Sequence, residues 1–504
     1  MIPEVKDIRI LIVAAIILIP TIFFPASSDL SVFMLGGKVI ADGGELFKDF
    51  FDLKAPLTYY FFALIDLLTG GNIIATRIVD YIITLSFVLS ANYILFKLNL
   101  DRAVRWIFII GFSASYVTLN HSNTMQCETL TYLPMIWYFY QIVKPNRNST
   151  LVKGILLGII VSFKYSLGLV FLADIIYSLT QSNFNWKFAR NKIIELTVAL
   201  LCVFLSFLPT IAQGNTLYLD GLFAYLDKYK AHPPINLGFI KEYLKGLGYL
   251  FGDYYSLLFS AAAIYSVVLF PFKKNENADK VFNFILLFFI LLFVSFLIER
   301  KPNLYQFSRV YPFLIMLSSY GLYSLYKSIS VKNKIAFTFV LFFALFLSPL
   351  PRVVNTMKIP MDYFRNKENY IFNFSHDDGT GNYNAMAILE EYTKPKGKSF
   401  IYVNSGSHQY LRRSESYYKY PLSAFYLGDF DNQGIVEEVA KDMEKVDYLI
   451  IQNDDNHYAN FFNHLSSYDN MMRIERFNKL LNDDFELDTL LDGRYYIYDR
   501  KKVE

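Results

Sequence analysis

A stretch near the N-terminus combines the side chains that acid–base and phosphate chemistry need. Residues 27–57 read SSDLSVFMLGGKVIADGGELFKDFFDLKAPL and follow the first apolar segment of the chain. The stretch contains the carboxylates Asp29, Asp49 and Asp52 and the cation Lys54. A carboxylate can take a proton from an attacking hydroxyl, and a fixed cation can stabilise a phosphate that leaves. The stretch therefore supplies both groups that transfer from a phosphate-linked donor requires.

The same charges have a competing, purely structural interpretation. Ser27 and Ser28 are favourable N-cap residues, so Asp29 would stand in the first turn of a helix, Asp29 to Ala41, and complement its dipole. The later charges would be ordinary solvated loop charges. They alternate with phenylalanines, however, and run into the apolar string PLTYYFFALIDLL. We therefore expect the loop to lie along a membrane surface, with its charges at the interface.

The composition indicates an integral membrane protein. Hydrophobic residues make up 54% of the chain, above the 45–50% typical of soluble domains. Eleven apolar segments are candidate spans, although some are short against the roughly 20 residues that a bilayer crossing needs. Lys164 interrupts the apolar run 151–180 and marks the expected turn of a hairpin. The candidate spans are 10–26, 72–96, 104–119, 125–143, 151–163, 165–180, 193–213, 247–271, 281–298, 304–326 and 335–350.

The positions of lysine and arginine predict the orientation of these spans. Basic residues concentrate on every second loop, and such loops stay on the cytoplasmic side. The N-terminus is then inside, whereas the first loop, 26–71, and everything after Leu350 are outside. The basic clusters are Lys6/Arg9, Lys97/Arg102/Arg105, Lys144/Arg147/Lys153, Lys187/Arg190/Lys192, Lys273/Lys274/Lys280 and Lys327/Lys332/Lys334.

The charge balance changes near residue 355 and marks a domain boundary. From Asn355 onward the sequence holds 18 Lys and Arg against 25 Asp and Glu, so the positive excess belongs to the preceding part. Pro349, Pro351 and Pro360 are typical of a linker there. We predict a transmembrane catalytic domain, 1–354, and an extracytoplasmic α/β domain, 355–504. The expected strands are 398–404, 446–452 and 494–499, and the expected helices are 383–393, 433–444, 456–467 and 471–480.

Other site classes find no support in the sequence. Cys127 and Cys202 lie in different predicted helices, so neither a disulfide framework nor a zinc site can be built from them. The chain has no Gly-rich phosphate loop, no histidine-based metal motif and no basic stripe for nucleic acid. We therefore expect no metal, no cofactor and no nucleic-acid partner.

The loop string GELFKDFFDLKAP, together with an aspartate just after the first span, resembles a known superfamily. It is similar to the polyprenyl-phosphate-sugar-dependent glycosyltransferases of the GT-C superfamily, in particular the protein O-mannosyltransferase and aminoarabinose transferase relatives. The resemblance implies an α-helical multi-pass protein of about eleven spans. It also implies a first outside loop with membrane-parallel helices and a small periplasmic α/β domain at the C-terminus.

The resemblance assigns roles to four residues of the loop. Asp29 matches the acidic residue that similar enzymes use as catalytic base, and Lys54 matches the lysine that contacts the lipid phosphate. Asp49 and Asp52 match acidic positions with a loop-ordering or acceptor-positioning role. The chain departs from many relatives in one respect, because Leu30 follows Asp29 where an acidic pair is common.

Further positions outside the loop resemble residues of the same cavity. Glu128, in NTMQCETLTYLP, matches an acidic position, but it is equally a favourable charge at a helix N-terminus. Lys164 matches a second cation, and an isolated lysine in an apolar hairpin is costly unless it pairs or faces water. In KPNLYQFSRVYPFL, Tyr305 and Gln306 stand where relatives often have a His-Tyr pair. Arg309 is a candidate phosphate ligand, with a snorkelling interfacial arginine as the alternative.

These residues together predict a glycosyltransferase in a bacterial cytoplasmic membrane. It would move a sugar from a polyprenyl-phosphate donor to a hydroxyl of a lipid, glycan or protein acceptor on the outer face. By analogy the reaction would invert the anomeric centre without a metal, with the lipid-linked phosphosugar as co-substrate. Two alternatives remain open: a carrier or flippase for a polyprenyl-linked glycan, and a catalytically silent scaffold subunit among membrane assembly partners.

Overall fold

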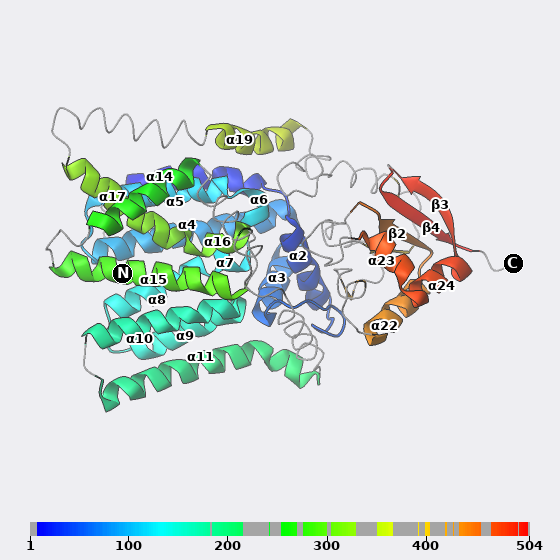
Figure 1. Ribbon diagram of the computed structural model, residues 1–504, viewed down its shortest axis with the longest axis horizontal. Helices are drawn as coiled ribbons and strands as arrows, with labels where there is room; N and C mark the ends of the chain where they lie inside the picture. The colour runs from blue at the N-terminus through cyan, green and yellow to red at the C-terminus, as the bar shows by residue number, and fades with distance from the viewer. Residues whose placement is uncertain are drawn as a thin grey trace. The chain divides into compact units, whose positions relative to one another are not determined.

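The computed structural model contains two compact units, and most described residues are helical (Figure 1). Unit 1 comprises residues 1–24, 74–207 and 233–361, and unit 2 comprises residues 25–73, 208–232 and 362–504. The structure describes residues 8–181, 184–214, 241, 254–269, 276–299, 304–328, 350–365, 392, 399–403, 419–420, 427, 433–454, 465–491 and 493–501.

Unit 1 is a bundle of helices that lie side by side in Figure 1. Its interior is apolar and rich in aromatic rings; the Phe139 and Phe284 rings, for example, stack with centroids 5.1 Å apart. The elements are α1 (Ile8–Leu18), η1 (Ile19–Phe23), α4 (Ile73–Lys97), α5 (Arg102–Thr118), α6 (Asn120–Asn123), α7 (Cys127–Leu130), α8 (Tyr132–Val143), α9 (Ser149–Phe163), η2 (Tyr165–Leu169), α10 (Val170–Gln181), α11 (Trp186–Ala212), α14 (Tyr254–Leu269), α15 (Glu276–Glu299), α16 (Leu304–Phe307), η4 (Ser308–Val310), α17 (Tyr311–Ser328) and α19 (Leu350–Arg365).

Two helices of the described residues, α4 and α11, are long and apolar enough to cross a membrane. Large apolar side chains of α11 stay exposed, including Leu200, Leu201 and Phe204. Ile8, Ile12 and Ile16 form a similar exposed stripe at four-residue spacing on α1. Lipid would cover such stripes. The predicted count of eleven spans stays a prediction, and the segment 335–350 lies almost wholly outside the described residues.

Breaks in the helices of unit 1 determine where polar side chains stand. Lys164 has extended backbone (φ −153°, ψ 107°) between α9 and η2, so the hairpin turn predicted at this residue is confirmed. The predicted span 125–143 is divided into α7 and α8, and the segment 304–326 into α16, η4 and α17. Each break brings a charged residue into the bundle: Glu128 in α7, Lys164 at the hairpin turn and Arg309 in η4.

A buried ionic cluster joins three helices of unit 1. Lys153 of α9 lies 2.6 Å from a carboxylate oxygen of Asp174 on α10 and 2.9 Å from Glu195 on α11. Lys192 pairs with the same two carboxylates. The Tyr138 hydroxyl donates to Glu195 at 2.8 Å. The sequence predicts Lys153 and Lys192 as loop cations, whereas the structure places both on helices and pairs them.

Unit 2 begins with two helices of the first loop, α2 (Ser28–Ala41) and α3 (Pro56–Thr69). The predicted helix is therefore confirmed, and Ser27 is its N-cap, with its hydroxyl accepting from Leu30 N at 3.2 Å. The two helices approach closely at Gly36 and Gly37. A Cβ on Gly37 would come within 2.5 Å of the Phe62 backbone, so this position requires glycine.

The phenylalanines of the first loop are buried against protein. Their alternation with charges is therefore not evidence that the loop lies along a membrane surface, as the sequence predicts. Phe47, Phe50 and Phe51 are at most 4% exposed. The Phe50 ring lies 5.4 Å from the Tyr59 ring of α3, and the Phe51 ring 5.7 Å from that of Tyr420. Phe51 N also donates to the Lys419 carbonyl at 2.7 Å. These rings are apolar because they form a core within unit 2.

The far end of α3 supplies the exposed apolar face instead. Leu64, Leu67 and Leu68 are 55%, 69% and 73% exposed and share one side of the helix, since their spacing is three and four residues. Such a face suits contact with lipid.

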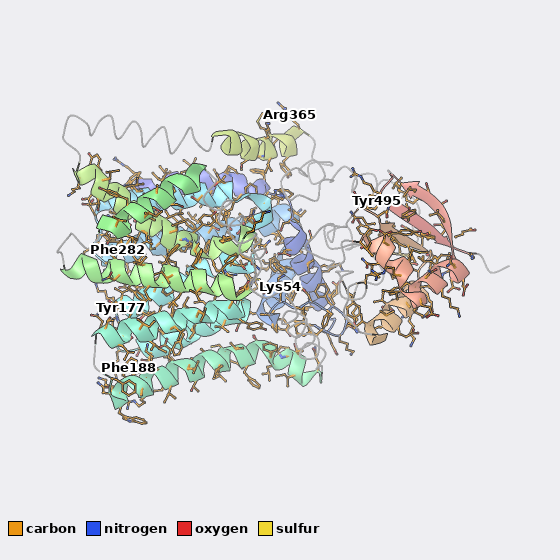
Figure 2. The ribbon with its side chains drawn as sticks, in the orientation of Figure 1. Lys54, Tyr177, Phe188, Phe282, Arg365 and Tyr495 are labelled. Carbon is orange, nitrogen blue, oxygen red and sulfur yellow. The ribbon has the colours of Figure 1, made fainter. Side chains whose placement is uncertain are left out.

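The described C-terminal part of unit 2 contains a four-stranded sheet with three helices. The strand order is β1-β2-β4-β3; β1 and β2 are parallel, and the β2/β4 and β4/β3 pairs are antiparallel. Tyr495 is fully buried in this sheet (Figure 2). The elements are β1 (Phe400–Val403), α22 (Gln433–Met443), β2 (Tyr448–Gln452), α23 (Ser467–Arg473), α24 (Glu475–Asp484), β3 (Phe485–Leu491) and β4 (Tyr495–Arg500).

The sequence predicts most of these elements and misses one. Strands β1, β2 and β4 and helix α22 fall on the predicted runs, and α24 overlaps the predicted helix 471–480. Strand β3 was not predicted, because its side chains are mostly exposed and its acidic sequence lacks an apolar run. Most residues of the predicted helices 383–393 and 456–467 lie outside the described residues. The prediction of a linker at the prolines is wrong, because helix α19 spans Leu350–Arg365 and contains Pro360.

Tyr420 connects the first loop to this C-terminal part. Its ring contacts Phe51, and its hydroxyl donates to a Glu438 carboxylate oxygen at 2.8 Å. Burial and this carboxylate raise the pKa of Tyr420 well above its ordinary value, so the phenol remains a neutral donor. The loop that carries Asp29 and Lys54 is thus held to α22 through residues of its own unit.

Candidate active site

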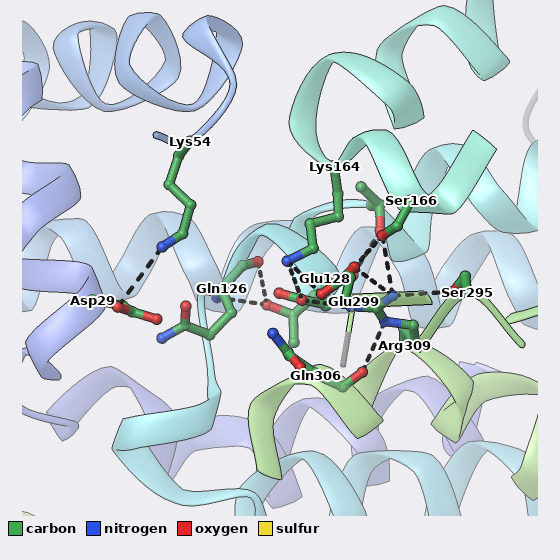
Figure 3. Close-up of polar contacts among 12 residues, drawn as sticks. Asp29, Lys54, Gln126, Glu128, Lys164, Ser166, Ser295, Glu299, Gln306 and Arg309 are labelled. Atoms are coloured by element: carbon green, nitrogen blue, oxygen red, sulfur yellow. Dashed lines mark hydrogen bonds and ion pairs between the residues drawn. The ribbon is translucent and has the colours of Figure 1, made fainter. Parts of the chain in front are cut away.

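Unit 2 brings Asp29 and Lys54 together from positions 25 residues apart. The Lys54 ammonium lies 3.9 Å from a carboxylate oxygen of Asp29 and 5.4 Å from the centroid of the Phe33 ring (Figure 3). Both side chains are a little over one quarter exposed. Among the described residues, no hydrogen bond to the Asp29 carboxylate is formed, so its oxygens are available to a substrate hydroxyl.

The helix N-terminus defines the position of Asp29. Ser27 caps α2, and Asp29 is the second helical residue, where a carboxylate is stabilised by the helix dipole. Asp29 is therefore not the capping group. The cap and the carboxylate can be changed independently.

The other acidic residues of the loop make contacts within it. A carboxylate oxygen of Asp49 accepts from Glu45 N at 2.8 Å, and one of Asp52 accepts from Leu53 N at 2.7 Å. The second Asp52 oxygen accepts from the Tyr59 hydroxyl. Asp52 is 4% exposed. These hydrogen bonds tie Asp49 to the loop backbone and Asp52 to the backbone and to α3, whereas the Asp29 carboxylate accepts none among the described residues.

Unit 1 contains a compact cluster of two cations and two carboxylates (Figure 3). The Lys164 ammonium lies 3.1 Å from both Glu128 and Glu299. The Arg309 guanidinium lies 3.0 Å from Glu128 and 2.8 Å from Glu299. The four charges balance, as burial requires, because an unpaired ion in the protein interior costs several kcal/mol.

Exposure divides the cluster into a closed and an open half. Arg309 and Glu128 are 0% and 1% exposed, whereas Lys164 and Glu299 are 16% and 15% exposed. Arg309 also donates to the Gln306 carbonyl at 2.9 Å and to the Ser295 hydroxyl at 3.0 Å. A fully buried arginine with these partners is not a snorkelling residue, so that alternative for Arg309 is wrong. Lys164 is the cation that an incoming anion can reach.

The cluster includes residues that the sequence did not single out. Glu299 ends α15, and a charge directly after such a long apolar run is a signal that the sequence offers. Ser166 donates to Glu299 and accepts from Arg309 at 3.2 Å. Neither serine of the cluster has a sequence signal, since a single hydroxyl in an apolar run is common.

The two glutamines of the cluster region differ in their partners. Gln126 caps α7, and its backbone N donates to the Thr129 hydroxyl at 3.0 Å. Gln306 is 2% exposed, and within the described part of the chain its Oε1 atom has no hydrogen-bond partner. Tyr305 belongs to α16, but its side chain lies outside the described residues.

A buried arginine, Arg77, holds the segments that precede Asp29 and Glu128 in the sequence. Arg77 of α4 is fully buried and donates to the Phe24 carbonyl at 3.1 Å, to the His121 carbonyl at 3.2 Å and to the Thr124 hydroxyl at 3.0 Å. Asp80, 3.5 Å away, is its ionic partner. Phe24 directly precedes the loop of Asp29, and Thr124 precedes Glu128 by four residues.

Comparison with known families supplies the class of reaction. Residues 53–212 match the model of the dolichyl-phosphate-mannose-protein mannosyltransferase family. The predicted resemblance is confirmed. The match supports a GT-C superfamily glycosyltransferase and a membrane location. It begins one residue before Lys54 and includes Glu128 and Lys164, but it covers less than half of the chain. A comparison with curated proteins found no match.

Proposed function

We propose that this chain is a polyprenyl-phosphate-sugar-dependent glycosyltransferase. It transfers the sugar to an acceptor hydroxyl on the outer face of a bacterial cytoplasmic membrane and inverts the anomeric centre. The Asp29–Lys54 pair carries this proposal, because it combines an accessible carboxylate with a cation in one loop. The family match supports the reaction class, and the acceptor is a hydroxyl of a lipid, glycan or protein.

The proposed step is a single displacement. The acceptor oxygen bonds to the anomeric carbon while its proton passes to the Asp29 carboxylate. The bond between the anomeric carbon and the phosphate oxygen breaks, and its electron pair stays on the departing polyprenyl phosphate. Lys54 stabilises the charge that develops there. Because the donor already carries its leaving group, the reaction requires no nucleotide. The proposal assigns the charge on the departing phosphate to Lys54, so the proposed step includes no metal.

Lys164 and Arg309 have a proposed part in binding the donor phosphate, and contacts within unit 1 support it. Lys164 is the more exposed cation of its cluster and is held by Glu299, which is equally exposed. An incoming phosphate can replace Glu299 as the partner of Lys164. Arg309 is enclosed by both carboxylates, so its part is to hold the cluster while that exchange occurs.

The deciding experiment is Asp29→Asn in the purified full-length protein. Ser27 remains the cap of α2, so the loop should fold as in the wild type. Loss of a general base should lower sugar transfer by roughly 10² to 10⁴. The assay measures transfer from purified undecaprenyl-phosphate sugars to a mixed lipid and peptide acceptor pool, together with the thermal stability of each variant.

Asp42→Asn is the matched control. Asp42 belongs to the same loop but pairs with Lys38 at its surface, and the variant should transfer sugar at the wild-type rate. A fully active Asp29→Asn protein would remove Asp29 as the base. If the wild type binds the donors and transfers none of them, the carrier or scaffold interpretation replaces this proposal.

A further inference from the structure

The side chain of Gln306 is enclosed, and its Oε1 atom has no hydrogen-bonding partner among the described residues. It projects from α16 beside the Glu128–Arg309 ion pair (Figure 3), and the residue is only 2% exposed. In the part of the chain that the structure describes, its carboxamide forms no hydrogen bond, and Oε1 is completely buried. Buried amide groups are normally paired, so an unpaired one beside a polar cluster indicates a ligand.

A second buried glutamine of unit 1 shows the ordinary arrangement. Gln141 of α8 is 7% exposed, and its Oε1 atom accepts from the Ser149 hydroxyl at 2.6 Å. Gln306 differs from Gln141, because its Oε1 atom has no such partner among the described residues.

The unpaired atom restricts the chemistry of the ligand. Oε1 is an acceptor, so the group that pairs with it must donate a hydrogen. An ionised phosphate only accepts, and the nearby cations Lys164 and Arg309 are the groups that suit it. A sugar hydroxyl donates and also accepts, and a carboxamide offers both functions on one planar group.

We propose that Gln306 hydrogen-bonds a hydroxyl of the donor sugar and determines which sugar is accepted. This inference rests on the proposed function, because it places the sugar of the lipid-linked donor next to the Lys164–Arg309 cluster of unit 1. A site built to bind a substrate hydroxyl rejects analogues that lack it far more strongly than an apolar pocket does. Gln306 is thus a specificity residue, distinct from the base and from the phosphate ligands.

The test compares Gln306→Leu with the wild type on a defined donor series. Undecaprenyl phosphate linked to mannose, glucose, galactose or a pentose identifies the preferred sugar. Its monodeoxy derivatives then remove one hydroxyl at a time. For one derivative, the wild type should lose at least tenfold in kcat/KM relative to the parent sugar. Gln306→Leu should lose at least tenfold on the parent sugar and discriminate against that derivative less than threefold.

Gln141→Leu is the control for a purely structural glutamine. It should lower the thermal stability of the unliganded protein and leave the order of sugar preference unchanged, since it breaks a hydrogen bond remote from the cluster. Gln306→Leu should raise the thermal stability of the unliganded protein, because it removes an unpaired buried polar group. The opposite signs separate a binding role from a structural one.

Three outcomes are decisive. If Gln306→Leu reduces the use of all sugars equally, or of none, the specificity role is overturned while sugar transfer itself stands. If the wild type transfers no sugar, binding is measured by the thermal shift that undecaprenyl phosphate and its glycosylated forms produce. A sugar-dependent shift that Gln306→Leu abolishes would then retain the inference and reject the transferase. A shift that is independent of Gln306 would reject the inference as well.

Discussion

The Arg77–Asp80 pair offers a sharp test of how unit 1 is held together. Arg77 and Asp80 are 0% and 1% exposed, and Asp80 also accepts from the Tyr116 hydroxyl at 2.6 Å. Methionine at position 77 retains much of the side-chain volume but removes the charge and the three hydrogen bonds to Phe24, His121 and Thr124. Asp80 would then be a buried carboxylate without its cation.

The expected cost follows from the lost partner. Breaking a buried ion pair by removing one member costs about 3–5 kcal/mol, since the remaining charge is left uncompensated. Three hydrogen bonds from a charged donor, at about 1.5–3 kcal/mol each, would add to more than this, but the same desolvation is counted in both figures. We therefore expect Arg77→Met to cost about 3–5 kcal/mol, a factor of roughly 10² to 10⁴ in the folded-to-unfolded ratio.

The assay heats the protein in detergent and measures the temperature at which half of it is no longer monodisperse. Arg77→Met should lower it strongly, and Arg77→Met with Asp80→Asn should recover part of the loss, because the orphaned charge is gone. Arg147→Met is the control, since Arg147 is exposed in the loop after α8 and should tolerate the change. If the single and double variants lose equal stability, the ionic interaction between Arg77 and Asp80 is not what holds these segments, and the reasoning is wrong.

Two further predictions concern the donor and the membrane. Lys54→Ala should raise the KM for the undecaprenyl-phosphate donor strongly, whereas Lys54→Arg should retain part of the activity because the charge remains but the geometry changes. Lys164→Ala should cause a smaller loss of activity. An unchanged KM in Lys54→Ala would remove Lys54 from the site. Single cysteines placed at the exposed positions Arg147 and Asp483 should differ in their reaction with membrane-impermeant maleimide added outside the cell. The cysteine at position 483 should be labelled, and the one at position 147 should not. The reverse result would place the first loop on the inner face.

Local sequence determined the features that depend on neighbouring residues. The apolar composition indicated a membrane protein, and the spacing of Ser27 and Asp29 predicted the start of α2. Lys164 marked its hairpin turn because a charge inside an apolar run is costly unless it pairs or faces water. The loop string GELFKDFFDLKAP carried the family resemblance, since its charges and aromatic residues are contiguous.

The tertiary structure decided which charges meet and which side chains stay unpaired. Arg309 pairs with Glu128 across 181 residues of sequence, and no local pattern specifies such a pairing. The phenylalanines of the first loop resembled a membrane-contacting surface, yet they pack against Tyr59 and Tyr420, because alternation of apolar residues does not say whether lipid or protein covers them. The sequence placed Gln306 only by resemblance to a position in relatives, and its unpaired Oε1 atom depends on how α16 packs against α6 and α15.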